Sequence, residues 1–424
     1  MRSCHIAPGA FWAIAVAVLS AVSIQAAEVS YDLVIRNGMI VDGSGNPWFK
    51  GDVAVRGERI VGLGRVPAGT ARREIDAFGL VVAPGFIDMH SHSDFLLLED
   101  GTALSKIHQG VTTEVLGEGT SAGPYLGKLP ARAVTEDGFR PRWTTLAEYF
   151  AALEKSGISV NVATYAGLDN IWQCVMGKSF ERPTAEQFEQ MASFLDEAMQ
   201  DGAFGLSSML MMPPGSLATT DDIVRLCRVV ARRRGIYSSH IRNEGTDVVA
   251  AVKEAIAIGE RAGVPVDIIH LKIAEQKLWG RMDEIVALIE AARKRGVNVQ
   301  ANVYPYTRGN NDLVSVIPPW AHEGGTARLL ERLKSPADRA RMKKDIRDGL
   351  PGWYNHYSAV GGDWSRMLVS GKGLLEGLTM DRVLAARSKD YHPKPDPLDV
   401  LFDLLIEHNG SVPTIYEHHT EPSS

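Results

Sequence analysis

Residues 82–94, with the sequence V-A-P-G-F-I-D-M-H-S-H-S-D, constrain the fold and chemistry of this chain more than any other stretch. Pro84-Gly85 predicts a turn, and the apolar pair Phe86-Ile87 predicts a short strand that leads into His90 and His92. Side chains alternate along a strand, so the two histidines project to the same side, about 7 Å apart at the backbone. Two such imidazoles can bind one divalent cation, although two histidines lining a polar loop would have the same spacing.

Strand-length and helix-length patterns alternate after this segment. Strands are predicted at residues 112–116, 160–165, 203–206, 236–240, 264–270 and 297–304, and helices at 146–155, 185–200, 220–234, 248–262 and 282–295. This alternation indicates βαβ units and a parallel sheet. Together with the strand that leads into His90, these six strands make seven, which favours an α/β fold of the (β/α)8 TIM-like barrel type over an open doubly wound sheet. No G-x-G-x-x-G motif follows a strand, which argues against a dinucleotide-binding fold.

Residues 1–27 have the form of a secretory signal peptide. A positive start at Arg2 precedes an apolar run at 10–22, and the small residues Ala26-Ala27 follow. The run is short for a transmembrane helix, so we expect cleavage and no stable membrane insertion afterwards, with an uncleaved anchor as the alternative. The mature protein is then expected to be periplasmic or secreted.

Residues 28–83 predict a small N-terminal β domain of the β-sandwich type, and residues 84–424 the barrel. Apolar segments at 33–35 and 39–41 flank Asn37-Gly38, a pattern typical of a hairpin. So short a sheet rarely stands alone, so we expect it to pack on the barrel or to pair with strands from elsewhere.

Composition excludes two classes of protein. The formal net charge of -6 over 424 residues provides no basic surface, so no nucleic-acid partner is expected. Removal of residues 1–27 would leave only Cys174 and Cys227, which is not a disulfide framework. Cys227 lies in a helical pattern and is predicted to be a buried free thiol.

Four histidines, His90, His92, His240 and His270, each follow an apolar run at the carboxyl end of a predicted strand. Active sites of (β/α)8 barrels are built at that end of the strands. A shared metal ion explains four such histidines better than four separate core histidines do. Imidazoles suit zinc, and also iron, nickel or manganese. Such an ion lowers the pKa of bound water and polarises a carbonyl, which predicts hydrolysis.

The segment P-G-F-I-D-M-H-S-H-S-D resembles the first-strand motif of the amidohydrolase superfamily. Further motifs are similar to those of the N-acyl-D-amino-acid deacylases (D-aminoacylases): G-V-T-T from Gly110, G-L-S-S from Gly205, P-P-G from Pro213, S-H-I-R-N-E from Ser239 and Y-P-Y from Tyr304. The resemblance extends from about Tyr31 to Thr420. It implies hydrolysis of the amide bond of a small-molecule N-acyl-D-amino acid, with one or two zinc ions.

The resemblance also implies roles for individual residues. His90, His92, His240 and His270 would be metal ligands, and Lys272 and Tyr304 would contact the substrate carboxylate. A cation near the metal can neutralise an anionic amino acid. Arg242 is a further substrate-binding candidate; Arg242 and Glu244 could instead orient ligands or pair with each other.

The chain departs from the family pattern at three places. Gly117-Glu118-Gly119 lacks the cysteine that many deacylases use as a metal ligand, and Glu118 is the predicted substitute. Met212 stands where the family often has tyrosine, which predicts a softer, less polar pocket. No strand carries the family's general-base aspartate: Asp363, Asp390 and Asp396 all lie in loop-like contexts, so the catalytic base is unknown. We therefore expect a barrel that is incomplete at its C-terminus, in a shortened chain.

Two other functions fit these residues. One is a cyclic-amide hydrolase related to dihydroorotases and hydantoinases, which share the H-x-H element. The other is a non-catalytic remnant that binds a metal or a ligand only.

Overall fold

The computed structural model describes residues 31–67, 71–129, 142–371, 373, 375–390 and 393–419. The predicted signal peptide at residues 1–27 lies outside these ranges. The chain divides into two compact units, with the boundary between Pro84 and Gly85. Among the described helices, none combines the length and the apolar character that crossing a bilayer requires.

The first unit contains one mixed five-stranded sheet, in the order β3-β2-β1-β4, with β5 also paired to β1. Its strands are β1 (Tyr31–Ile40), β2 (Phe49–Arg56), β3 (Arg59–Gly64), β4 (Ala71–Asp76) and β5 (Val81–Val82). β1 is antiparallel to β2 and parallel to β4 and β5. The described part of this unit therefore forms one continuous hydrogen-bonded sheet, and its sandwich arrangement stays a prediction.

The hairpin predicted at Asn37-Gly38 is wrong. Apart from Val41, both predicted arms belong to the single strand β1, whose pairing with β2 shifts register between Ile35 and Gly38. Asn37 has a φ of 61°, a conformation that Asn tolerates at a bulge as well as in a turn. Its side chain donates to Asp76 and its backbone N–H to Asp52, so the bulge is fixed by its neighbours.

Parallel strands dominate the second unit. They are β6 (Phe86–Asp88), β7 (Val111–Leu116), β8 (Asn161–Thr164), β9 (Ala166–Gly167), β10 (Gly205–Met209), β11 (Ile236–His240), β12 (Val266–Ile268) and β13 (Val299–Ala301). They form the sheets β6-β7-β8 and β13-β12-β11-β10-β9. Only Tyr165 separates β8 from β9, so the parallel strands follow one another in chain order, as the sequence predicts.

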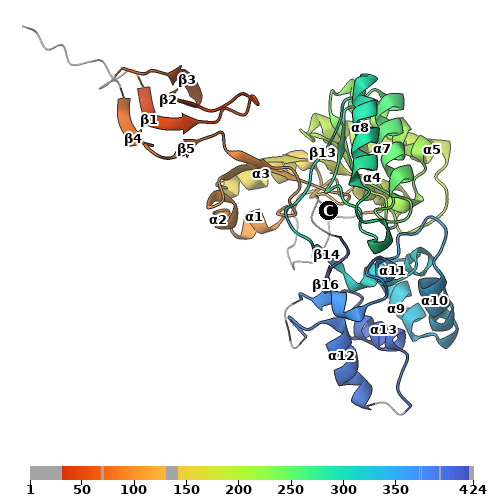
Figure 1. Ribbon diagram of the computed structural model, residues 1–424. Coiled ribbons are helices and arrows are strands. Elements are labelled where there is room, and N and C mark those ends of the chain that lie inside the picture. The colour runs from red at the N-terminus through yellow and green to blue at the C-terminus, as the bar shows by residue number, and fades with distance from the viewer. Residues whose placement is uncertain are drawn as a thin grey trace, which may run out of the picture. The chain divides into compact units, whose positions relative to one another are not determined.

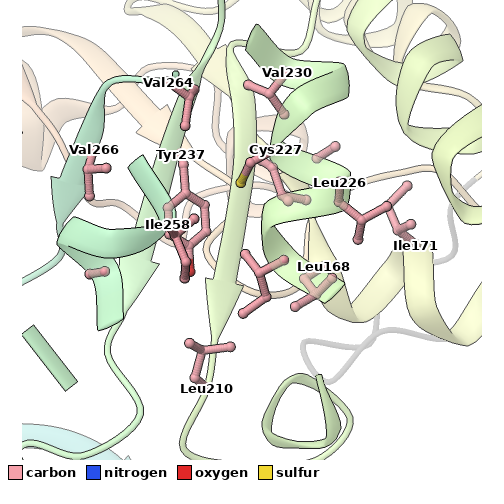
Figure 2. Packing of buried hydrophobic residues seen from close by; sticks show 14 of the residues in the cluster. Leu168, Ile171, Leu210, Leu226, Cys227, Val230, Tyr237, Ile258, Val264 and Val266 are labelled. Carbon is pink, nitrogen blue, oxygen red and sulfur yellow. The ribbon is translucent and has the colours of Figure 1, made fainter. Parts of the chain in front are cut away.

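Helices alternate with these strands. The α-helices up to β13 are α1 (Leu96–Glu99), α2 (Leu104–Ile107), α3 (Leu146–Ser156), α4 (Leu168–Met176), α5 (Ala185–Gln200), α6 (Thr220–Arg232), α7 (Val248–Ala262) and α8 (Met282–Lys294). Each of the helices α4 to α8 contacts the next one along the chain. Figure 1 shows α4, α5, α7 and α8 gathered in one part of the unit. The apolar faces of α4 to α8 pack on the strands, where Cys227 of α6 lies among buried residues such as Tyr237 and Leu226 (Figure 2). Cys227 is a buried free thiol, which confirms that prediction.

A second core belongs to the lobe formed by residues 309–416. The lobe contains the antiparallel sheet β14-β16-β15, with β14 (Gly309–Asp312), β15 (Met367–Val369) and β16 (Pro413–Tyr416). Its α-helices are α9 (Thr326–Lys334), α10 (Pro336–Asp348), α11 (His356–Ala359), α12 (Met380–Arg387) and α13 (Pro397–Glu407), which gather beside β14 and β16 in Figure 1. Phe402, Leu405 and Tyr416 are fully buried between these helices and the sheet.

Candidate metal centre

Glu118 and the two histidines of the H-x-H motif form one cluster. The Nε2 atoms of His90 and His92 lie 3.0 Å apart, and Glu118 Oε2 lies 3.2 Å from His90 Nε2 and 3.4 Å from His92 Nε2. His90 and His92 follow the end of β6, and Glu118 follows the end of β7, which is parallel to β6. The carboxyl ends of parallel strands meet at one edge, and this brings the three side chains together.

The same carboxylate belongs to a second cluster with His240 and His270. One potential ligand atom from each of these three residues lies within 4.8 Å of the other two. The imidazole rings of His240 and His270 have centroids 4.5 Å apart, and the rings of His90 and His270 are 5.1 Å apart. The structure therefore brings together all five residues that the sequence predicts as metal ligands, with Glu118 common to both clusters.

The apolar core fixes His240 and His270. His240 is the last residue of β11 and is paired with Met209 of β10. His270 follows β12, whose three residues, Val266, Asp267 and Ile268, are all buried. His270 has a φ of 36°, and its backbone N–H donates to Asn302 Oδ1 at 2.8 Å. That hydrogen bond and the buried strand hold an uncommon backbone conformation next to the other imidazoles.

The protonation states suit a cation. Burial alone raises the pKa of the Glu118 carboxyl, but its hydrogen bond with His90 and the nearby imidazoles outweigh burial and hold that pKa well below its usual range. Burial, reinforced by Lys272, lowers the pKa of His270 to about 4. At neutral pH the site therefore offers an ionised carboxylate and a neutral His270 imidazole, and metal ligands require those forms.

The donor atoms also fit a metal. Glu118 Oε1 is buried and has no hydrogen-bond partner among the described residues, while Oε2 faces His90 and His92. An ionised oxygen buried in this way is costly unless it meets a cation or a donor. Four imidazoles and one shared carboxylate are the ligand types that zinc and related divalent ions prefer. The residues present therefore fit one metal ion, or a pair of ions that would share Glu118.

The sequence left two roles open for Glu244, and in the structure Glu244 contacts Lys272 and His270. It accepts from Lys272 Nζ at 2.6 Å and lies 3.1 Å from His270 Nδ1. Lys272 Nζ also lies 3.0 Å from His270 Nδ1 and 3.2 Å from the His270 carbonyl oxygen. Lys272, Glu244 and His270 are thus one buried group, and Lys272 holds the pKa of Glu244 well below its usual range even though burial alone raises it.

Arg242 does not pair with Glu244, which was one of the two alternatives for these residues. Its guanidinium makes two hydrogen bonds with Glu254 of α7, both 2.9 Å, and donates to the carbonyls of Ser216 and Ala218. These contacts hold the segment after β10 against α7. Most of the N–H donors of Arg242 are therefore already used within the protein. A contact between Arg242 and the substrate stays a prediction.

Tyr304 lies beside Lys272 and His270. Lys272 Nζ is 5.5 Å from the centroid of the Tyr304 ring, and the rings of His270 and Tyr304 are 6.1 Å apart. The Tyr304 hydroxyl is buried and has no partner among the described residues. Lys272 and Tyr304 therefore stand side by side next to the histidines, and their contact with a substrate stays a prediction.

The aspartates that were weighed as bases have structural roles. Asp363 accepts from the backbone N–H of Ser365 at 2.9 Å and begins a short 3-10 helix at Trp364–Arg366. Asp396 accepts from the backbone N–H of Leu398 at the start of α13 and pairs with Arg347 at 2.5 Å. The sequence predicts that both aspartates lie in loops and not at the ends of strands. In the structure both are N-caps of helices.

No family model matches the sequence. A D-aminoacylase of Alcaligenes xylosoxydans xylosoxydans is 38% identical over 292 residues, which cover 68% of this chain and 60% of that protein. The structure of a D-aminoacylase studied for its binuclear metal centre matches with a TM-score of 0.72 and 30% identity, over 93% of this chain and 73% of that one. The N-acyl-D-glutamate deacylase from Bordetella bronchiseptica, solved with zinc and a phosphonate inhibitor, matches over the same shares with a TM-score of 0.73 and 30% identity. The chain spans about 60% of the length of the curated relatives that it matches.

Proposed function

Since the chain belongs to the D-aminoacylase family of amidohydrolases, we propose that it hydrolyses the amide bond of N-acyl-D-amino acids at a zinc centre of one or two ions. The amidohydrolase fold expected from the sequence is confirmed by the same similarity. The observation that carries the proposal is the convergence of His90, His92, His240 and His270 on the shared carboxylate Glu118.

In this proposal His90, His92 and Glu118 hold one cation position, and Glu118, His240 and His270 hold the other. A divalent ion bound there supplies a Lewis acid that polarises the amide carbonyl and lowers the pKa of water. Glu244 Oε1 can accept the Nδ1–H of His270, which fixes that tautomer and leaves Nε2 unprotonated as a ligand atom.

Lys272 and Tyr304 supply the recognition of the substrate carboxylate in this proposal. The Lys272 ammonium has three N–H donors, and two acceptors lie nearby, Glu244 Oε1 and the His270 carbonyl oxygen. With His270 Nδ1 protonated and directed at Glu244, the third Lys272 N–H remains for a substrate carboxylate. The Tyr304 hydroxyl has no partner among the described residues, so it is a second donor available to the substrate.

Hydrolysis of a panel of N-acetyl-D- and N-acetyl-L-amino acids by metal-free and zinc-loaded protein tests the proposal. We expect zinc-dependent release of free D-amino acids and little release from the L series. Zinc binding without turnover of any substrate would favour the non-catalytic binding function. Turnover of hydantoins or dihydroorotate in place of the N-acetyl compounds would assign a cyclic-amide hydrolase.

We also propose that residues 1–27 direct export, so that the deacylase acts in a periplasm or outside the cell. The support is the sequence pattern of a positive start, an apolar middle and small residues before Glu28. N-terminal sequencing of the exported protein tests this. A first residue near Glu28 supports cleavage, and an intact Met1 in the membrane fraction contradicts it.

A further inference from the structure

A polar network lies beneath the His90-x-His92 loop and touches neither imidazole. Asp88, the last residue of β6, accepts the backbone N–H of His90 through Oδ1 at 3.1 Å. Its other oxygen, Oδ2, accepts from Lys106 Nζ at 2.5 Å. Lys106 belongs to the short helix α2, so this contact ties the exit of β6 to an element that follows both histidines.

Ser91, the residue between the two histidines, is fixed by its backbone and its side chain. Its N–H donates to the carbonyl of Val115 on β7 at 2.9 Å. Its hydroxyl donates to Glu114 Oε2 at 2.6 Å, and Lys106 Nζ lies 3.3 Å from the same hydroxyl oxygen. Glu114 is fully buried and lies on β7, the strand that leads to Glu118.

One cation serves both carboxylates of this network. Lys106 Nζ is 2.5 Å from Asp88 Oδ2 and 4.0 Å from Glu114 Oε2, and the Lys106 side chain is only 25% exposed. Loss of the ammonium would leave two neighbouring carboxylates with like charge and little solvent. Asp88 and Glu114 would then separate, and each is hydrogen-bonded to the loop that carries His90 and His92.

We propose that Lys106 is a positioning residue for the metal centre, which sets the geometry of His90 and His92 through Asp88 and Ser91. The effect is local. In the second cluster, His240 and His270 take their geometry from β11, β12 and Asn302, and Lys106 has no hydrogen bond or ion pair with these elements among the described residues. Glu118, which follows β7, is common to both clusters. The inference rests on the metal centre of the proposed function and does not require that the chain hydrolyse any particular amide.

Zinc titration of the metal-free full-length protein against a chromophoric chelator, at fixed pH, tests this proposal. We expect the wild type to bind two equivalents. In Lys106→Met, the equivalent held by His90, His92 and Glu118 should weaken by about 10–100-fold, the range found when outer partners of ligands are lost. The other equivalent should keep its affinity. Lys106→Arg, which retains the charge, should recover most of the loss.

The matched control is Lys343→Met in the lobe. Lys343 is 22% exposed and also lies between two carboxylates, 2.8 Å from Asp399 and 3.7 Å from Asp396. The same substitution there should lower the thermal midpoint and leave both zinc affinities unchanged. Equal loss of zinc affinity in the Lys106 and Lys343 variants would overturn the proposal, because it would show a general loss of folding.

Ser91→Ala covers the case in which Lys106→Met does not fold. It removes only the hydroxyl that reaches Glu114, and we expect it to weaken the same equivalent by a smaller factor. Wild-type zinc affinity in both Lys106→Met and Ser91→Ala contradicts the inference, as does an equal loss at both equivalents. A wild type that binds zinc and hydrolyses nothing would refute the proposed deacylase activity and leave this inference intact.

Discussion

Acidic side chains do different work in the parallel-strand region and in the lobe of residues 309–416. In the parallel-strand region, Glu244 is buried and the Glu118 side chain is only 11% exposed, and both direct oxygens at imidazoles or at Lys272. Asp312, Asp363 and Asp396, in the lobe, accept backbone N–H groups at the starts of helices. The comparison shows which feature distinguishes a carboxylate of the site from a structural carboxylate. That feature is its position near the carboxyl ends of the parallel strands, more than whether the residue is Asp or Glu.

The largest effect is expected at Glu118, because both histidine clusters share it. Glu118→Ala should lower the affinity for zinc at both equivalents by more than about 100-fold, beyond the loss typical of outer partners, and abolish zinc-dependent turnover. The measurement is zinc stoichiometry after dialysis. Retention of one equivalent at wild-type affinity would show that Glu118 serves a single cluster and would weaken the comparison.

Lys272→Met should give the next largest effect, because Glu244 would remain buried without its cation. We expect the free energy of unfolding of the metal-free protein to fall by about 3–5 kcal/mol at pH 7. Addition of Glu244→Gln should recover part of this loss, since it removes the uncompensated charge. Urea unfolding at pH 7 of both variants measures this.

The contribution of the Lys272–Glu244 pair to the free energy of unfolding depends on pH. The folded pKa of Glu244 is depressed, so its stabilisation is present above the unfolded pKa of about 4.3 and is lost as the pH falls through the folded value. The difference in stability between wild type and Lys272→Met should therefore shrink below about pH 4. A difference that is constant from pH 7 to pH 3 would assign the loss to packing and not to charge.

Hydrophobic periodicity carried most of what could be predicted. It gave α5 and α7 with their observed bounds and placed His240 at the end of β11, because a helix or strand packed on one side repeats with a fixed period. Asn37-Gly38 was misread because one dipeptide suits a bulge and a turn equally. In the lobe the pattern predicts helices at residues 337–347 and 397–408, which correspond to α10 and α13, and it misses α9, α11 and α12.

Pairings between distant residues could not be predicted from the pattern. Lys272 with Glu244 and Lys106 with Asp88 are partners across 28 and 18 positions, and nothing in a single sequence decides which cation meets which carboxylate. The start of α6, in contrast, is fixed locally. Thr219 has the extended backbone that a cap requires, and its side chain accepts the backbone N–H of Asp222, so Thr220 is the first helical residue, as predicted.

The lobe should respond to acid through a buried histidine. Burial lowers the pKa of His322 to about 4, against about 6.5 in the unfolded chain. Between these pH values the unfolded state binds a proton that the folded state does not. The free energy of unfolding therefore decreases by up to about 3 kcal/mol as the pH is lowered from 6.5 to 4. His322→Gln should reduce this slope in urea unfolding between pH 6.5 and 4 by the contribution of one histidine, because burial also lowers the pKa values of His356 and His418. His408→Gln, at an exposed position after α13, should keep it, and equal slopes in all three proteins would contradict the prediction.

The smallest effect is expected at Asp363. Its Oδ1 accepts the backbone N–H of Ser365 at 2.9 Å and the Ser365 hydroxyl at 2.7 Å, and the side chain is half exposed. Asp363→Ala should therefore cost about 1 kcal/mol of stability, as for other lost N-caps, and leave kcat and KM unchanged. Loss of a general base would instead lower turnover by about 100- to 10,000-fold. A fall of that size in a folded, zinc-loaded Asp363→Ala would place a catalytic carboxylate in the lobe and break the distinction between the two regions.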